Sequence, residues 1–319
     1  MPPNASPAPL PVRFPSQVAY QDAIACPAVC FADPLLRICE PVDKTPWGSP
    51  APITGQFANV YRLRSPDGRV WAVKLFLRDV PDRTRCYHAL QTHLQITPVP
   101  PWLVPFAYHE RGIRIEAGWF PVLQMPWLHD GLPLNSYLGA IVNNPVAVRA
   151  LRGAWRTLIA DMERARFAHG DLQHGNVLVS GGAGGTLPVL HLLDYDGAWV
   201  PALAGRVASE SGHPAYQHPG RKPGDFGIGT DRFAAVAVDT ALLILTHAPD
   251  LWYRFDNGEN ILWRREDFAQ TRATGRALHE LSFHESAPVR RAASALRAVC
   301  EAPATQVPDL ERYAPLMAV

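Results

Sequence analysis

The sequence predicts an α+β protein, in which a small β-rich part with one main helix precedes a larger, mainly α-helical part. Apolar residues alternate between Ala51 and Met125, which indicates several short strands. After the turn-forming run from His129 to Gly131, apolar residues recur at helical spacing. The 319 residues are enough to bury a full core, and length alone leaves open one bilobal unit or two compact domains.

The β-rich part is expected to hold short strands and one helix. The strands are expected at Val60 and Tyr61, Val70–Leu77, Ile113–Phe120 and Val122–Met125. The helix is expected over Pro81–Leu94, because Pro81 and Asp82 suit the first turn of a helix. Residues 1–18 are rich in proline and have no apolar run of signal-peptide length, which indicates a disordered lead-in.

The second part is expected to contain long helices and a hairpin. The helices are expected over Leu134–Val142, Val146–Ala168, Phe233–His247 and Val289–Cys300. Two short strands, Val177–Val179 and Val189–Leu193, are separated by a glycine-rich run that suits a hairpin. The most apolar stretch, Phe233–Ala248, is shorter than a membrane span and contains Asp239, so it predicts a buried helix and no membrane span.

Charge and cysteine content limit the expected location and partners. The 30 Lys and Arg residues nearly balance the 29 Asp and Glu residues, so no overall field favours nucleic acid or an anionic membrane. The five cysteines are odd in number and scattered, which favours a reducing, cytoplasmic location. Cys26, Cys30 and Cys39 lie near one another without the spacing of a zinc knuckle, and their role is left open.

The run from His169 to Leu178 carries the strongest chemical signal. Asp171 is followed five residues later by Asn176, between a predicted helix and a short apolar strand. The carboxylate of Asp171 suits a base that accepts the proton of an attacking hydroxyl. The amide oxygen of Asn176 suits a metal ligand beside phosphates, so this loop predicts phosphoryl-transfer chemistry.

A second run supplies the metal-binding carboxylate. Asp194 directly follows an apolar strand and is followed by an aromatic residue, Tyr195, and a nearby glycine, Gly197. Asp194 is therefore the expected Mg²⁺ ligand together with Asn176. Asp196 is expected to be only a turn residue before Gly197.

The strand that ends at Lys74 indicates how a nucleotide is held. Lys74 closes the apolar strand that begins at Trp71, and its charge is expected to contact phosphates. If Val60 is aligned with the last position of a glycine-rich phosphate loop, Gly55 is the glycine that remains and Phe57 stands at the loop tip. Backbone amides near Gly55 are expected to approach the phosphates.

Taken in order, these runs resemble the protein-kinase-like superfamily and, within it, a bacterial serine/threonine-kinase-like group. The runs that carry the closer resemblance are Gly55–Tyr61, Asp194–Gly197, Gly212–Pro219 and Asn257–Asn260. The resemblance spans roughly residues 19–319 and implies a bilobal protein-kinase-like fold, with the N-lobe over residues 19–128 and the C-lobe over 129–319. It also implies that Gly212–Pro219 docks a peptide, and that Asp231 caps the central helix and ties the catalytic loop.

The resemblance implies a site for ATP with Mg²⁺ or Mn²⁺. Asp171 is the implied base, Lys74 and Asn176 complete the catalytic set, and Asn176 and Asp194 hold the metal. The implied nucleotide pocket consists of Gly55, Phe57, Val60, Ala72, Lys74, Met125 as gatekeeper, Pro126 and Leu128 as hinge backbone, and Leu178 as floor.

The sequence departs from the kinase pattern at three places. No Glu or Asp lies between Asp82 and His109, so the usual acidic partner of Lys74 is missing. Two interpretations stay open: Gln91 or His93 replaces it through a neutral hydrogen bond, or both are ordinary exposed residues of the helix. Gly170 stands where Arg often precedes the base, and Gln173 stands where Lys is usual.

The segment after Gly197 bears on regulation. Its apolar residues Trp199, Val200, Leu203 and Val207 are expected to dock on the larger lobe without a phosphate. We therefore expect constitutive competence, with regulation from a protein partner or from the N-terminal extension.

Three functions follow from the resemblance. The first is a Ser/Thr protein kinase that acts on a protein substrate. The second is a pseudokinase or nucleotide-binding scaffold, which the missing acidic partner favours and which retention of Lys74, Asp171, Asn176 and Asp194 opposes. The third is a small-molecule kinase, which Gly170 favours and the docking segment Gly212–Pro219 opposes.

Overall fold

The computed structural model describes residues 13–96, 100–182, 186–256 and 258–317. Within these ranges the chain forms twelve α-helices and nine strands, which confirms the predicted α+β class. Contacts divide the chain into two compact units. Unit 1 is formed by Met1–Thr84 with Pro105–Trp127, and unit 2 by Arg85–Val104 with Leu128–Val319.

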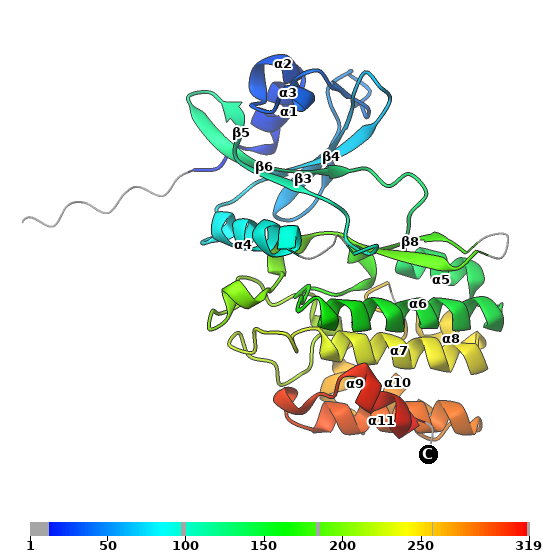
Figure 1. Ribbon diagram of the computed structural model, residues 1–319. Helices are drawn as coiled ribbons and strands as arrows, with labels where there is room; N and C mark the ends of the chain where they lie inside the picture. The colour runs from blue at the N-terminus through cyan, green and yellow to red at the C-terminus, as the bar shows by residue number, and fades with distance from the viewer. Residues whose placement is uncertain (1–12, 97–99, 183–185, 257, 318–319) are drawn as a thin grey trace, which may run out of the picture. The chain divides into compact units, whose positions relative to one another are not determined.

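Unit 1 is built on one antiparallel sheet (Figure 1). Its strands are β1 (Glu40–Pro41), β2 (Ile53–Thr54), β3 (Ala58–Arg64), β4 (Val70–Phe76), β5 (Ala107–Ile115) and β6 (Gly118–Pro126). The order is β1-β3-β4-β6-β5, and β2 pairs with β3. The single strand expected over Ile113–Phe120 is wrong, because the chain turns at Glu116, whose φ is 52°, and residues on either side belong to different strands.

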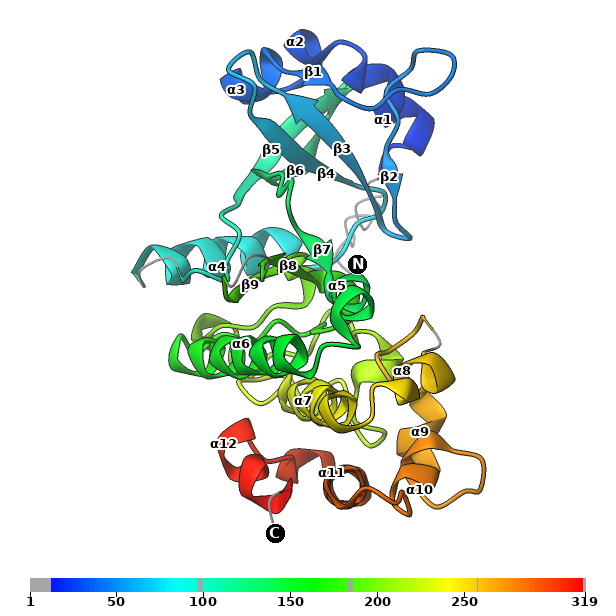
Figure 2. The same ribbon diagram turned by 90° about the vertical axis from the view of Figure 1, so that its right-hand side faces the viewer.

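Three short helices cover one face of this sheet, α1 (Gln17–Ile24), α2 (Pro27–Cys30) and α3 (Pro34–Arg37), as Figure 2 shows. Apolar side chains from the helices and from β3 to β6 form the core of unit 1: Tyr20, Ile24, Phe31, Leu36, Tyr61, Leu63, Val73, Leu75, Ile113 and Val122. The side chain of Asp33 accepts the N–H groups of Leu35 and Leu36, which fixes the start of α3. No sequence pattern predicted these three helices.

The expected disordered lead-in lies partly outside the described residues, which begin at residue 13. For residues 13–18 the expectation is wrong. Ser16 Oγ accepts the Ala19 N–H and caps α1. The Phe14 ring packs edge-on against Phe120, with 5.5 Å between the ring centroids. An N-cap serine and an apolar anchor therefore begin the fold before Val18.

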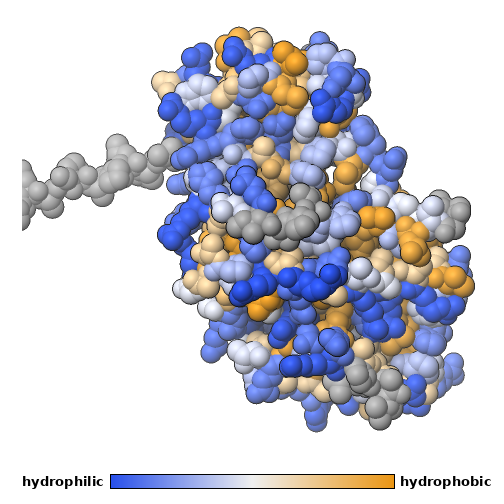
Figure 3. All heavy atoms as spheres, in the orientation of Figure 1, coloured by the Kyte–Doolittle hydropathy of each residue, from blue (hydrophilic) through white to orange (hydrophobic). Residues whose placement is uncertain are grey.

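Unit 2 contains nine of the α-helices in the described ranges and a three-stranded antiparallel sheet. The helices are α4 (Arg83–Ile96, whose first two residues belong to unit 1), α5 (Leu134–Ile141), α6 (Pro145–Arg164), α7 (Arg232–His247), α8 (Asp250–Phe255), α9 (Arg265–Ala269), α10 (Ala277–Leu281), α11 (Ala287–Glu301) and α12 (Leu310–Tyr313). The strands are β7 (Leu132–Pro133), β8 (Val177–Gly181) and β9 (Pro188–Leu192). Hydrophobic side chains gather over β8 in Figure 3. Leu132 of β7, Val189 of β9 and the nearby Leu187 are exposed.

Most predicted elements of unit 2 are confirmed, with shifted ends. The helix expected over Val146–Ala168 ends at Arg164, because Arg166 adopts a φ of 51° and Ala168 forms a bridge with Trp199. Residues 85–104, which the sequence placed in the first part, group with unit 2. His93 Nε2 donates to the Ala165 carbonyl at 2.7 Å, and this bond attaches α4 to the end of α6.

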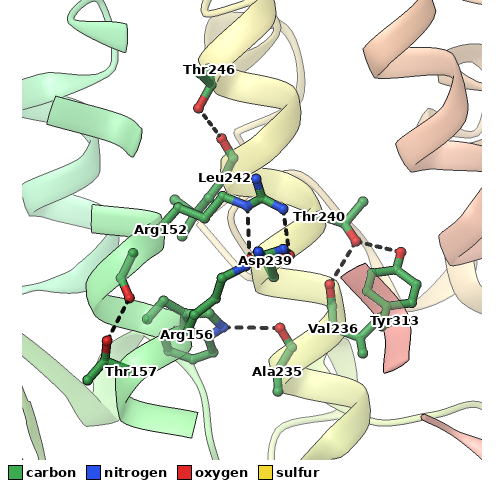
Figure 4. Close-up of polar contacts among 12 residues, drawn as sticks. Arg152, Arg156, Thr157, Ala235, Val236, Asp239, Thr240, Leu242, Thr246 and Tyr313 are labelled. Carbon is green, nitrogen blue, oxygen red and sulfur yellow. Dashed lines mark hydrogen bonds and ion pairs between the residues drawn. The ribbon is translucent and has the colours of Figure 1, made fainter. Parts of the chain in front are cut away.

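Helix α7 is buried along nearly its whole length, as predicted. Figure 4 shows Asp239, which is fully buried, between two arginines of α6. Arg152 and Arg156 each donate two hydrogen bonds to its carboxylate, at 2.7 to 2.9 Å. One negative and two positive charges therefore join α6 to α7. Within the described ranges, no helix is both long enough and apolar enough to span a membrane.

Candidate active site

The backbone of the loop that carries Asp171 is held by Asp231. The Asp231 carboxylate accepts the N–H of His169 and, at 2.9 Å, the N–H of Gly170. Burial raises the pKa of this carboxyl group, and the two backbone donors oppose that rise. The predicted tie to the loop is confirmed. The predicted side-chain cap on α7 is wrong, because the carboxylate is turned to the loop and makes no capping bond.

Gly170 is required at its position by geometry. Its φ is +82°, and a Cβ built there would lie 1.9 Å from the carbonyl oxygen of Gly197. No side chain fits beside that oxygen without backbone movement. Gly170 is therefore part of the packing between the loop and the segment that follows Asp196.

His169 joins the loop to the strand that precedes Asp194. Its ring is fully buried. Nε2 donates to the carbonyl of Leu193 at 2.6 Å, while Nδ1 accepts the N–H of Asp171 at 3.3 Å. Both ring nitrogens are thus used by a neutral imidazole. The His169 ring therefore connects the backbone of Asp171 to the backbone of Leu193, the residue before Asp194.

Asp171 and Asn176, which the sequence predicts in one loop, are in direct contact. Asn176 Nδ2 donates to the Asp171 carbonyl at 2.8 Å and to Asp171 Oδ2 at 3.0 Å. The backbone N–H of His213 donates to Asp171 Oδ1 at 2.6 Å. Each carboxylate oxygen keeps a second lone pair, and Asp171 is only partly buried. An incoming hydroxyl group can therefore donate to this carboxylate.

The two expected metal ligands, Asn176 and Asp194, lie on backbone segments that one hydrogen bond joins. Leu193 N donates to the Asn176 carbonyl at 2.9 Å, which places Asp194 one residue beyond the contact. Asp194 is exposed and has a φ of 63°, a left-handed conformation that costs about 1 kcal/mol or more for a residue with a Cβ. Among the described residues, Asn176 Oδ1 makes no hydrogen bond, whereas the amide nitrogen donates two hydrogen bonds to Asp171.

Asp196 does more than the turn role predicted for it. Tyr87 OH donates to Asp196 Oδ1, so a side chain of α4 is bound to the segment that follows Asp194. Together with the bond from His93 to Ala165, this contact fixes α4 within unit 2. No sequence pattern pointed to this role of Tyr87.

The predicted docking segment is tied to the loop that carries Asp171. Gly212 has a φ of +69°, and a Cβ there would lie 2.8 Å from the Gly170 carbonyl oxygen. His174 Nδ1 and Tyr216 OH are 2.6 Å apart and hydrogen-bonded. Burial lowers the pKa of His174, and the nearby His213 lowers it further. Asn260 Nδ2 donates to the carbonyl of Ala215 and fixes the far side of the segment.

Predicted nucleotide contacts in unit 1 share one face of its sheet. Val60 pairs with Lys74, Lys74 with Leu123, and Ala72 with Met125. Directly opposed residues project to the same side, and alternate residues of a strand do so as well. Because Val73 and Leu75 point into the core under α1 to α3, these residues lie on the other face. Lys74 Nζ is 5.5 Å from the centre of the Phe76 ring.

The remaining predicted contacts fall at the edges of these elements. The Gly55 N–H donates to the Ala58 carbonyl at 2.9 Å and closes the β2–β3 turn. The Phe57 ring lies at its tip, 3.3 Å from the Arg78 guanidinium carbon. Pro126 ends β6, whereas Leu128 belongs to unit 2, as does Leu178, which pairs with Pro133 and His191 in β8.

The cysteine cluster gives no metal site. Cys26 is exposed, whereas Cys30 and Cys39 are buried, and all three are free thiols. Burial raises the pKa of Cys30 to about 12, which makes it a poor ligand at neutral pH. In the part of the chain that the structure describes, no group of three or more His, Cys, Asp or Glu side chains is placed to hold a metal ion.

The chain was compared with known proteins. No protein-family model matches it, and no curated protein matches it either.

Proposed function

We propose that the chain is an ATP- and Mg²⁺-dependent phosphotransferase with the two-lobed protein-kinase-like fold, and that it phosphorylates Ser or Thr in a protein. The observation that carries the proposal is the environment of Asp171. Its carboxylate is held on one side by the Asn176 amide at 3.0 Å and on the other by the His213 N–H at 2.6 Å. A base fixed in this way holds the remaining lone pair of each oxygen in a defined direction for a proton donor.

In the proposed reaction the acceptor hydroxyl donates its hydrogen bond to Asp171. The proton passes to the carboxylate as the hydroxyl oxygen bonds to the γ-phosphorus of ATP and the bond to the ADP oxygen breaks. Asn176 and His213 keep the carboxylate in place. Because His213 is in the docking segment, binding of the acceptor protein and positioning of the base are coupled.

The donor atoms near Asp171 fit a magnesium ion. Asn176 Oδ1, which has no hydrogen bond among the described residues, and the exposed Asp194 carboxylate are the hard oxygen ligands that Mg²⁺ or Mn²⁺ prefers. The ion would supply charge neutralisation for the phosphates. The left-handed backbone at Asp194 is held by the buried Tyr195, whose hydroxyl donates to the Leu192 carbonyl at 2.6 Å.

The face of unit 1 that carries Lys74 fits an adenine nucleotide. Val60, Ala72 and Met125 would contact the base, and Lys74 would contact phosphates as a point charge. The carbonyl groups of Pro126 and Leu128 would accept hydrogen bonds from the base, a role that needs no N–H from proline. Lys74→Met is expected to weaken nucleotide binding and turnover together, whereas Gln91→Ala changes both far less.

The deciding experiment is incubation with γ-labelled ATP and Mg²⁺, alone and with a generic protein acceptor. We expect label on protein for the natural chain and almost none for Asp171→Asn. Asp250→Asn is the matched control, because it removes an exposed carboxylate of unit 2 that has no hydrogen bond within the described ranges. Equal labelling by Asp171→Asn and the control would overturn the proposal.

A nucleotide-binding scaffold is the second candidate, favoured by the chemistry of α4. This helix contains no acidic residue, and its Tyr87 binds Asp196. A scaffold would bind ATP without transferring label to protein in the same experiment. Binding that depends on Lys74 but no transfer with any acceptor would select this candidate.

A further inference from the structure

A cavity of about 230 Å³ lies in unit 2 beside the docking segment. Its walls come from the loop around Gly212, from the run that follows Tyr216, and from α9. Three of the residues that line the cavity, Arg221, Lys222 and Arg265, are cations. None of the lining residues is an acid, so the cavity carries a positive potential.

The three cations are not neutralised by ion pairs. Arg221 is partly buried, and its Nη1 donates to the Ser211 carbonyl at 3.2 Å and to Gln217 Oε1. Its Nε and Nη2 make no hydrogen bond to the described residues. Lys222 and Arg265 are exposed, and neither side chain has an ion pair within the described ranges. A bound anion would relieve the repulsion among these charges and supply acceptors for the free N–H groups.

Nearby carboxylates do not fill the cavity. Asp225 accepts the backbone N–H of Lys222 at 2.8 Å, and Asp231 is buried against the catalytic loop. Asp171, the third acid that acts on Arg221, is bound to Asn176 and His213. Burial lowers the pKa of Arg221, which is the expected response of a cation that has lost water without gaining a salt bridge.

The position of the cavity relates it to the acceptor. Gly212 lines the cavity, and the next residue, His213, donates to Asp171 Oδ1. A peptide whose hydroxyl reaches Asp171 would therefore lie close to Gly212 and to the cavity that it lines. We infer that the cavity binds a phosphorylated side chain of the acceptor protein, a few residues from the hydroxyl that is to be modified. The role in acceptor recognition rests on the proposed kinase activity, whereas anion binding does not.

The test measures peptide binding to the full chain by fluorescence anisotropy, without ATP, after phosphatase treatment to clear any phosphate from Ser211. The probe is a labelled peptide pool with one central serine and one phosphoserine at varied spacing. The reference is the same pool with serine in place of phosphoserine. We expect the phosphorylated pool to bind about tenfold more tightly, as charge-assisted hydrogen bonds allow.

Two double variants decide whether the cavity is responsible. Lys222→Gln with Arg265→Gln should remove the preference, because it removes two of the three cations that line the cavity. Both side chains are exposed, so they can be changed without disturbing the fold. Arg149→Gln with Arg291→Gln, which changes two exposed cations of α6 and α11 outside the cavity, should retain it. Equal binding of both pools, or a preference that survives the first double variant, overturns the inference. A preference without phosphotransfer to any acceptor leaves the anion site intact and rejects the kinase.

Discussion

The backbone N–H of His213 lies 2.6 Å from Asp171 Oδ1 and donates a hydrogen bond to it across 42 residues of sequence. The second oxygen of the carboxylate is 3.0 Å from Asn176 Nδ2. Asp171 is therefore surrounded by donors, and its position depends on two segments at once. The predicted docking segment, Gly212–Pro219, therefore contributes to the candidate site through His213.

Asp171→Asn is expected to abolish nearly all phosphotransfer. The carboxamide has no basic oxygen pair, and its NH₂ group would face one of the donors from His213 or Asn176. ATP affinity should stay close to that of the natural chain, because Asp171 meets the acceptor and not the nucleotide. Turnover is measured with labelled ATP, and affinity by nucleotide titration. Turnover at the natural rate would show that Asp171 is not the base.

Gly170→Ala is expected to destabilise unit 2 by about 2 kcal/mol or more, since the new Cβ would meet the Gly197 carbonyl oxygen and the φ is left-handed. The matched control is Gly153→Ala on α6, where a Cβ would meet nothing within 4 Å. That control should stabilise the protein by about 0.5–1 kcal/mol. Urea unfolding of both variants provides the measurement, and equal midpoints would contradict the argument.

Asp239→Asn is expected to cost about 3–5 kcal/mol of unfolding free energy, because two partly buried arginines would lose their shared carboxylate. Arg272→Gln is the control, since it breaks an ion pair with Glu301 that is mostly exposed on the arginine side. The control should leave the midpoint nearly unchanged. A small effect of Asp239→Asn would mean that water reaches the α6–α7 contact and replaces the carboxylate.

Stability should fall as the pH drops below about 6.5. Burial lowers the pKa of His218 from 6.5, and in the folded state Nδ1 accepts the Gly220 N–H at 3.0 Å while Nε2 donates to the Val299 carbonyl at 3.2 Å. The unfolded chain therefore binds protons before the folded chain does, so stability is complete above 6.5 and decreases below it. Burial also lowers the pKa of His174 and His191, which adds to the same trend.

The measurement is the urea midpoint at pH 7.5 and at pH 5.5. His218→Gln should reduce the difference between the two midpoints, because one proton-linked group is removed. An unchanged or rising midpoint toward pH 5.5 would reject the role of these histidines.

Sequence patterns predicted the long elements well and the short ones poorly. Helices α6, α7 and α11 have many turns on which apolar residues repeat, so their periodicity is visible. Helices α2 and α3 have four residues each, too few to show a period, and they are fixed by proline at the first turn and by packing on the sheet.

In the candidate site, too, short-range features were predicted and long-range contacts were not. Asp171 and Asn176 are five residues apart in one short loop, so their spacing predicted that both belong to one site, although not the hydrogen bond between them. The bond from Tyr87 to Asp196 joins residues 109 apart in sequence, and no local pattern indicates it. Asp231 was assigned to the loop correctly, but its missing cap on α7 depends on side-chain direction, which the sequence does not contain.

The last prediction concerns regulation. The segment after Gly197 is held by apolar packing, because Trp199, Val200 and Leu203 are buried and Trp199 forms a bridge with Ala168. Val207, which was expected to dock as well, is 64% exposed, so the packing ends before it. The space beside the base has no room for an arginine at position 170 that could hold a phosphate.

Ser209→Ala with Ser211→Ala should therefore keep turnover on an outside acceptor within about threefold of the natural chain, a barrier change below roughly 0.7 kcal/mol. Both serines are exposed, so the variant should fold normally. Turnover is measured with labelled ATP at saturating acceptor, so that a weaker acceptor affinity does not appear as lost activity. A hundredfold loss that Asp or Glu at either site restores would show instead that phosphate orders this segment through a charge-assisted pair.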